Sequence, residues 1–179
     1  MQRFVAFLLI LLFPTFTALS IELSWLTANN QSGRFVQEKH IKALSRPFVT
    51  KGQYHYSQDS GLRWHTLQPV DNQLLINKQG VSEIESDGST KLITSDVSFS
   101  QLLLSIFSAD KTLLTQQFTM QETPSGLSLS PLNPKIQSII KQINLTVVAK
   151  ELQQIELDEV SGNLTVISLT PSPIPPVVD

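Results

Sequence analysis

A serine stands three residues before a lysine at two places in this chain, and that spacing suits a serine nucleophile with a lysine base. Ser108 precedes Lys111, and Ser138 precedes Lys141. On a helix, this spacing places the amine one turn from the hydroxyl. Enzymes that use such a pair also carry Ser-Asp-Asn and Lys-Thr-Gly motifs, and the sequence contains neither. We therefore expect neither serine to be catalytic. A hydrolase that uses a Ser-Lys pair is the least favoured of the three functions that this subsection describes.

The three histidines, His40, His55 and His65, lie in segments with strand-like alternation. The spacing of His55 and His65 allows them to face each other across a hairpin, but two imidazoles without a carboxylate at ligand spacing make a weak zinc site. Cysteine is absent, which excludes disulfides, thiolate metal sites, a thiol nucleophile and a lipidated cysteine anchor. The glycines form no phosphate-binding loop. We expect no catalytic residue, no metal site and no cofactor.

Length and charge indicate one ordinary domain that does not bind nucleic acid. The chain has 179 residues, of which 41% are hydrophobic, and its 13 basic residues are outnumbered by 15 acidic ones. This length fits a single hydrophobic core. A formal net charge of -2 offers no basic surface for a phosphate backbone.

Residues 1–20 have the order of a secretory signal peptide. Arg3 is followed by an apolar stretch from Phe4 to Phe13, and Ala18 and Ser20 are small residues at the positions that a signal peptidase recognises. The apolar stretch is about half of the roughly 20 residues that a membrane-spanning helix needs. We expect cleavage after Ser20 and export of residues 21–179, in which 12 basic residues remain against 15 acidic ones.

The pattern after Gly33 alternates between apolar and polar residues, which predicts an antiparallel meander. Tyr54 and Tyr56 fall on one face of a strand, with Gln53 and His55 on the other. The Asp-Gly pair at 87–88 is a strong hairpin signal. Strands are expected over residues 34–41, 52–56, 62–66, 73–77, 81–86, 89–94, 113–122, 126–130, 143–149, 153–159 and 163–169.

Three helices are expected in addition to these strands. A short one is expected over residues 21–30, and an apolar one over 97–107 after the capping residues 94–96. The third begins at Pro134, where proline suits the first helical turn, and carries Ile136, Ile139 and Ile140. The single domain is expected to end near residue 170, because the proline-rich tail over 171–179 cannot join a sheet.

About ten strands with one apolar face each, and few helices, must curl to hide that face. A mainly β fold follows, with one curved sheet wrapped around one or two apolar helices. If a mobile helix covers the inner face, the interior becomes an apolar cavity. Burying half of a fatty chain there would contribute on the order of 5 to 8 kcal/mol, at about 0.8 kcal/mol per methylene. The alternative is a solid core filled by the same side chains, which composition alone favours.

Short motifs in both halves of the chain are shared with one protein family. They are residues 33–39, 44–47, 51–54, 62–64, 68–69 and 127–131, followed by the strands over 143–169. Together they resemble the LolA-type periplasmic lipoprotein carriers of Gram-negative bacteria. The resemblance implies a half-open antiparallel barrel with a helical lid, periplasmic localisation and no enzymatic activity. It also implies a monomer that shuttles acylated lipoprotein or lipid cargo from an inner-membrane exporter to an outer-membrane acceptor.

On this resemblance we expect the strands to form the wall of an apolar cavity and the helix over 97–107 to form its lid. The predicted lipid-binding residues are Phe35, Tyr54, Tyr56, Leu62, Trp64, Leu74, Ile76, Phe99, Leu102, Leu103, Ile106, Phe107, Phe118 and Met120.

The sequence departs from the founding carriers at one point. They have an Arg-Pro pair shortly before the segment that matches residues 62–64, and its arginine is tied to lid closure, whereas this chain has Gln58, Asp59, Ser60 and Gly61 there. Arg63 is adjacent to Trp64 and should point to the opposite face of the strand. Lid closure is therefore expected to be controlled differently. The second function considered is a lipid-sensing periplasmic domain that binds a membrane regulator.

Overall fold

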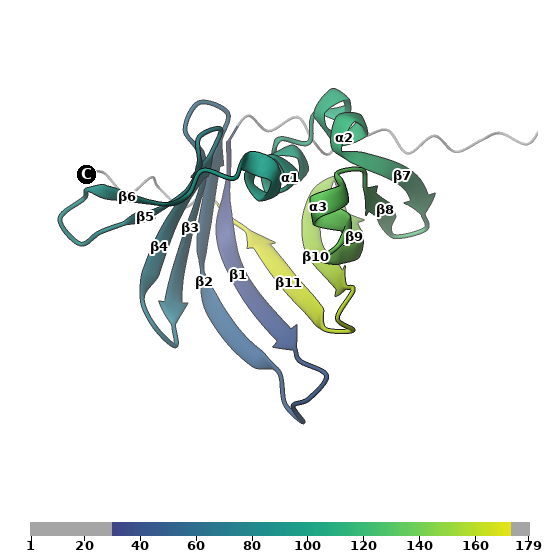
Figure 1. The fold of residues 1–179 in the computed structure, drawn as a ribbon, viewed down its shortest axis with the longest axis horizontal. Coiled ribbons are helices and arrows are strands. Elements are labelled where there is room, and N and C mark those ends of the chain that lie inside the picture. Colours follow the sequence, from purple (N-terminus) through teal and green to yellow (C-terminus); the bar gives the residue numbers. More distant parts are fainter. Residues whose placement is uncertain (1–29, 173–179) are drawn as a thin grey trace, which may run out of the picture.

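Alternating apolar residues build one curved antiparallel sheet of eleven strands, and three helices lie against its concave side (Figure 1). The structure is a computed structural model, described here for residues 30–172. The strands are β1 (Asn30–His40), β2 (Phe48–Ser57), β3 (Gly61–Gln68), β4 (Asn72–Asn77), β5 (Gly80–Ile84), β6 (Thr90–Thr94), β7 (Phe118–Thr123), β8 (Gly126–Pro131), β9 (Ile140–Val148), β10 (Glu151–Glu159) and β11 (Leu164–Pro171). The helices are α1 (Val97–Ser108), α2 (Lys111–Gln117) and α3 (Pro134–Gln137).

The sheet does not close into a barrel. Its order is β6-β5-β4-β3-β2-β1-β11-β10-β9-β8-β7, so β6 and β7 are the two edges, and Figure 1 shows the helices in the gap between them. The two halves of the chain meet where β1 pairs with β11, from Gly33 opposite Pro171 to His40 opposite Leu164. The predicted fold class, an incomplete antiparallel barrel with a helical cover, is confirmed.

Helix α1 is held over the sheet by its apolar side and closed at both ends by local hydrogen bonds. The Asp96 carboxylate caps it by accepting from the Ser98 N–H, and Ala109 ends it in the left-handed conformation. Leu102, Ile106 and Phe107 are buried, and the helix packs against β2, β3, β4 and β5. Helix α3 packs against β8 and β9. Among residues 30–172, the helices are all too short or too polar to cross a bilayer.

The strand predicted over residues 113–122 is wrong in its first half. Residues 111–117 form α2, and the strand begins only at Phe118. The cause is local: the Asp110 carboxylate accepts from the N–H groups of Thr112 and Leu113, which starts a helix directly after α1. Leu114, which is fully buried, then anchors this short helix in the core.

Two other boundaries also differ from the sequence prediction. Helix α3 ends at Gln137, so Ile139 lies outside it, and Ile140 is the first residue of β9. Pro171 does join the sheet, as the last residue of β11 opposite Gly33, where a missing N–H costs little. The predicted signal peptide lies outside the described residues, as do residues 21–29 of the helix predicted over 21–30 and residues 173–179 of the tail predicted over 171–179. Asn30 belongs to β1.

Candidate functional site

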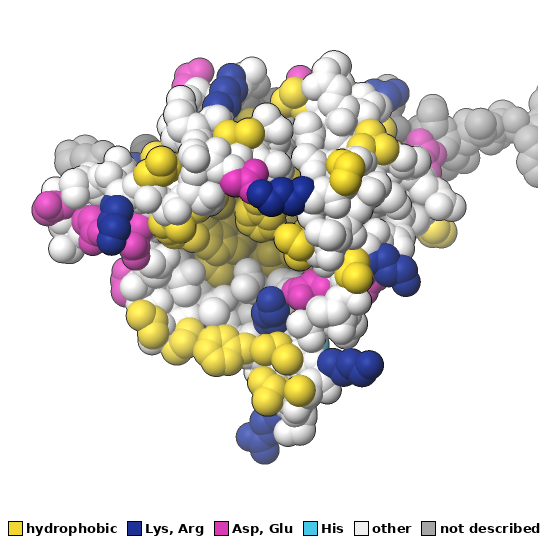
Figure 2. Space-filling view, in the orientation of Figure 1, with side chains coloured by type: hydrophobic (Ala, Val, Ile, Leu, Met, Phe, Trp, Pro, Cys, Tyr) yellow, Lys and Arg dark blue, Asp and Glu magenta, His cyan; other side chains and the backbone are white. Residues whose placement is uncertain are grey.

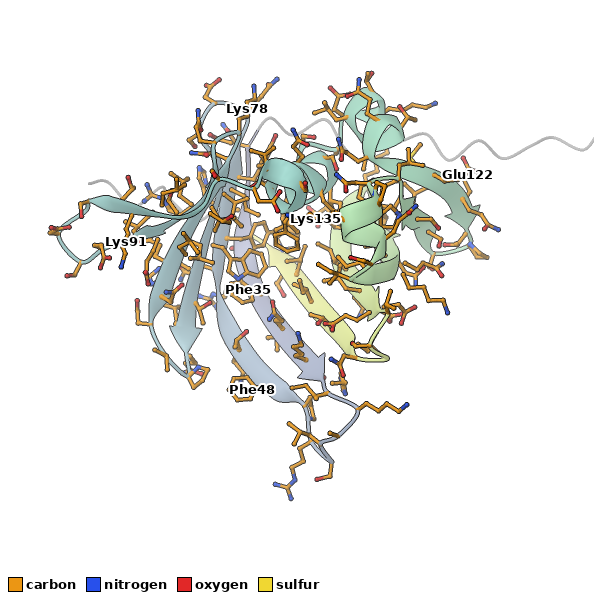
Figure 3. All side chains as sticks on the ribbon, in the orientation of Figure 1. Phe35, Phe48, Lys78, Lys91, Glu122 and Lys135 are labelled. Atoms are coloured by element: carbon orange, nitrogen blue, oxygen red, sulfur yellow. The ribbon has the colours of Figure 1, made fainter. Side chains whose placement is uncertain are left out.

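The concave face of the sheet is hollowed, and its surface is apolar. Figure 2 shows hydrophobic side chains on the floor of this hollow, below the helices and above the free ends of the central strands. Figure 3 shows Phe35 of β1 projecting into the same space beneath α1. The helices therefore cover one end of the concave face and leave the other end open.

Five aromatic side chains, which we call the aromatic cluster, connect the sheet to α1. Phe35 and Trp64 stack with ring centroids 3.9 Å apart, and Trp64 also meets the edge of Phe107 at 6.4 Å. Tyr54 and Tyr56 lie 5.6 and 6.3 Å from the Phe107 ring. Trp64 is only partly buried, whereas the other four are buried. The cluster is thus a continuous aromatic surface with one member open to the hollow.

Two glycines allow the rings of this cluster to lie flat on the sheet. Gly52 is opposite Phe35, and Gly33 is opposite Tyr54. A Cβ added to Gly52 would lie 2.7 Å from the Phe35 ring and 2.0 Å from a backbone oxygen of His65, and one added to Gly33 would lie 2.8 Å from the Tyr54 ring. Each ring therefore covers the bare backbone of its glycine partner, as aromatic side chains do in curved sheets.

The aromatic side chains of the site are uncharged at neutral pH. Burial raises the pKa of the Tyr54 hydroxyl to about 12, with a smaller contribution from the Glu151 carboxylate. Burial also raises the pKa of Tyr56. Both hydroxyls therefore stay protonated at neutral pH, and the cluster offers a neutral, apolar surface that suits hydrocarbon.

Helix α1 buries one polar side chain together with its apolar ones. Its Ser100 hydroxyl is fully buried, and it has no hydrogen-bond partner among the described groups. Such a group costs on the order of 1 to 3 kcal/mol. This cost applies while α1 is docked and opposes the gain from burying Leu102, Ile106 and Phe107.

A single ion pair joins the two helices that flank the opening. Lys135 of α3 donates to the Asp96 carboxylate that caps α1, and Figure 3 shows Lys135 between these helices. Nearby, the Asn133 amide donates to the Ser98 hydroxyl at 3.4 Å. Hydrogen bonds from Lys135 and from Ser98 lower the pKa of Asp96 to about 2. We call the Asp96–Lys135 pair the latch.

Replacing Asp96 with asparagine tests the latch, because asparagine still caps a helix but carries no charge. A carboxylate whose folded pKa is lowered stabilises the fold above its unfolded pKa and loses that contribution as the pH falls toward the folded value. Asp96→Asn should therefore melt at a lower temperature than the unmodified protein at pH 7. The difference should vanish as the pH falls from 3.8 to about 2. Thermal melts followed by circular dichroism measure it.

Lys135→Gln serves as the matched variant. It should have the same effect at pH 7, and the double variant should melt no lower than either single one, because both remove one interaction. A difference between Asp96→Asn and the unmodified protein that persists unchanged at pH 2 would contradict the latch.

The structure brings most of the predicted lipid-binding residues to the concave side. Trp64, Leu103 and Met120 are partly buried against the core. Leu74 is also partly buried, and it pairs with Trp64 across β3 and β4. Phe99 is 44% exposed and lies outside the core. The buried members of the predicted set are Phe35, Tyr54, Tyr56, Leu62, Ile76, Leu102, Ile106, Phe107 and Phe118. Whether these residues contact lipid stays a prediction.

The predicted lipid-binding set leaves out the buried side chains of the C-terminal strands, which lie in the same core. Their inward side chains alternate with polar ones along β8, β9 and β11, so the period of two was the signal that could have identified them. The large buried hydrophobic residues outside the predicted set are Leu127, Leu129, Ile140, Ile143, Leu145, Ile167 and Leu169, with Leu152 and Ile155 from β10 and Leu114 and Ile136 from the short helices.

Neither Ser-Lys pair lies within one helix. Ser108 ends α1, and Lys111 begins α2. The Ser108 hydroxyl donates to the Ser105 carbonyl, and the Ser138 hydroxyl donates to the Lys135 carbonyl. Lys141 lies in β9, beyond the end of α3. The geometry on which a serine nucleophile would depend is therefore not formed at either place.

The proposed pairing of His55 with His65 is wrong in register. His55 is opposite Arg63, and His65 is opposite Gln53. The His55 ring lies 3.0 Å from the Ser32 hydroxyl, and the His65 ring lies 3.2 Å from the Asp71 carboxylate. Within residues 30–172, no three His, Asp or Glu side chains are grouped to hold a metal ion. Arg63 alternates with the inward Leu62 and Trp64, as the strand period requires.

An open, curved sheet with an apolar concave face under short helices defines a half-barrel domain. The family described as "Outer membrane lipoprotein carrier protein LolA" matches residues 27–173. The chain therefore belongs to the LolA family. Comparison with curated proteins gives no match.

The solved structures that match this chain share little sequence with it. A LolA superfamily protein from Nitrosomonas europaea has 9% identity and a TM-score of 0.45, over 83% of this chain and 89% of that one. MucB in the MucA/MucB complex of Pseudomonas aeruginosa has 12% identity and a TM-score of 0.46, over 86% of this chain and 58% of the other. A putative outer membrane lipoprotein-sorting protein domain from Vibrio parahaemolyticus has 10% identity and a TM-score of 0.37, over 87% and 90%.

Proposed function

We propose that this protein is a periplasmic carrier that holds the acyl chains of lipoproteins or related lipids in the hollow and moves them from the inner to the outer membrane. Membership of the LolA family supports a carrier rather than an enzyme. The observation that carries the proposal is the aromatic cluster, in which Trp64 exposes part of a neutral apolar surface to the hollow. The signal-like residues 1–20 support export.

Hydrocarbon suits this surface for a physical reason. Each methylene that moves from water into an apolar site contributes about 0.8 kcal/mol, and no polar partner is needed. The side chains at the hollow are aromatic and aliphatic, and the tyrosines among them are buried and neutral. The carrier therefore recognises cargo by its acyl chains, while the rest of the cargo stays in water.

Release requires the cover to move, and the structure offers a separable element for this. Helix α1 contributes Phe107 to the aromatic cluster and Leu103 beside it. The latch ties its first turn to α3. In the proposed cycle, α1 is displaced when cargo enters from an inner-membrane exporter and returns when cargo passes to an outer-membrane acceptor. No covalent chemistry is involved.

A transfer assay tests this function. Inner-membrane vesicles that contain the exporter and a labelled lipoprotein are mixed with residues 21–179 and with separable outer-membrane vesicles. We expect a soluble complex of protein and lipoprotein first, followed by label in the acceptor vesicles in proportion to the protein added.

Two results would contradict the carrier function. Binding of lipid without any onward transfer would favour the lipid-sensing domain of a membrane regulator. Failure to form a soluble complex with any acylated cargo would contradict lipid binding itself. Albumin added in place of the protein is the control for non-specific extraction of label.

A further inference from the structure

Large hydrophobic side chains are exposed at the end of the sheet that the helices leave uncovered. Val70 is 70% exposed, Phe48 59% and Leu44 56%. Val49 and Leu67 are exposed as well. Figure 2 shows a row of hydrophobic side chains along this lower edge, and Figure 3 shows Phe48 in it. We call Leu44, Phe48, Val49, Leu67 and Val70 the rim.

The rim is one surface because of how three strands pair. Residues 41–47 connect β1 to β2, and residues 69–71 connect β3 to β4. Lys39 of β1 is opposite Phe48, and Lys51 of β2 is opposite Gln68. Both connections therefore emerge at the same end of the sheet. A group of this many exposed apolar side chains in one place typically marks an interaction surface.

Basic side chains are interspersed with the rim. Lys42, Arg46 and Lys51 are exposed, and none of them forms an ion pair with any described residue. Acidic side chains also lie at this end of the sheet, and only one of them, Glu159, pairs with a lysine among the described residues.

Glu159 pairs with Lys39, Glu38 lies beside His40, and Asp71 lies beside His65. The two histidines offset the carboxylate charge only when they are protonated. Lys42, Arg46 and Lys51 thus place exposed basic side chains beside the apolar ones, although the chain as a whole has a formal net charge of -2. Segments that combine exposed apolar side chains with Lys and Arg bind anionic membrane surfaces.

We propose that the rim docks on the headgroup region of an anionic phospholipid bilayer. Phe48 and Val70, which are the most exposed aromatic and aliphatic members, enter the interface, and Lys42, Arg46 and Lys51 contact lipid phosphates. Docking in this way turns the open end of the hollow toward the bilayer. The contact does not depend on bound cargo, so it is separable from the carrier function proposed above.

Flotation with pure lipid vesicles tests the proposal. Residues 21–179 are mixed with vesicles of phosphatidylcholine alone or with added phosphatidylglycerol, at low and high salt. We expect binding only to the anionic vesicles, and weaker binding as salt screens the charges. Phe48→Asp with Val70→Asp, and separately Lys42→Glu with Arg46→Glu, should each weaken binding by more than about tenfold.

The matched control is Leu92→Asp with Ile93→Asp. These side chains are each 56% exposed on the edge strand β6, so the control makes the same chemical change away from the rim. Its binding should equal that of the unmodified protein. Circular dichroism and uptake of a fluorescent fatty acid, measured on every variant, should show an intact fold and hollow.

Three results would overturn the membrane assignment. They are equal binding by the rim variants and the control, no binding of the unmodified protein to anionic vesicles, and retention only on membranes that contain protein. The last would assign the rim to a protein partner. Loss of fatty-acid uptake with vesicle binding kept would count against the carrier function alone.

Discussion

Trp64→Glu should abolish uptake of a fluorescent fatty acid. The change removes the ring that stacks on Phe35 and places a carboxylate where hydrocarbon must lie. An ionised carboxylate strongly resists transfer to an apolar environment, so we expect affinity to fall on the order of a hundredfold or more. Trp64 is only partly buried, which allows the variant to fold while the hollow is empty. Equilibrium fluorescence titration measures the affinity.

Three further variants make this test specific. Trp64→Phe keeps an aromatic floor and should bind nearly as well as the unmodified protein. Leu103→Glu places the same charge on α1, against the same core, and should also abolish uptake. Leu92→Glu on β6, away from the hollow, should have no effect. An unchanged titration in folded Trp64→Glu would show that acyl chains do not enter at this site.

Phe107→Ala should produce the largest loss of stability among single changes in α1. The Phe107 side chain is 1% exposed and contacts the rings of Tyr54, Tyr56 and Trp64. Truncation of a buried phenylalanine typically costs about 3 to 5 kcal/mol, because both burial and packing are lost. Urea unfolding followed by circular dichroism gives the free energy of unfolding.

Phe99→Ala is the control on the same helix. Phe99 is 44% exposed and outside the core, so its truncation should cost less than about 1 kcal/mol. Equal losses for the two variants would mean that Phe107 does not anchor α1. Hydrogen exchange that rises over residues 97–108 in Phe107→Ala, while the central strands stay protected, would locate the effect in the lid helix.

The sheet was predictable because each strand carries its own pattern. Tyr54 and Tyr56 alternate with polar residues, and both are buried on one face as expected. The Asp87–Gly88 pair lies in the turn between β5 and β6, where Gly88 has a φ of 81°. Local signals of this kind fix strand direction and turns without knowledge of the rest of the molecule.

Residues 111–117 were not predictable in the same way. Leu113 and Leu114 are compatible with a strand or a helix, because a short apolar segment has no clear period. The outcome was decided by the Asp110 carboxylate, which caps the Thr112 and Leu113 N–H groups. The helix cap at Asp110 therefore determined the structure of this segment, although its sequence has a weak strand-like alternation.

The site was predictable in its residue types but not in its geometry. Apolar residues on the strands and on α1 indicated an apolar interior. The stacking of Phe35 on Trp64, however, depends on the register of three strands. The flat placement of the Phe35 ring over Gly52 follows from that register. The latch joins residues 39 positions apart, and no local pattern pairs Asp96 with Lys135.

Quenching of Trp64 by brominated fatty acids tests most directly whether hydrocarbon enters the hollow. Trp25 and Trp64 are the two tryptophans of the chain, so Trp25→Phe leaves Trp64 as the sole reporter. Bromine quenches only on close approach, and we expect saturable quenching by a fatty acid brominated along its chain, reversed by excess unbrominated fatty acid. Trp64 emission that remains unchanged at saturating brominated fatty acid would contradict a lipid site against the aromatic cluster.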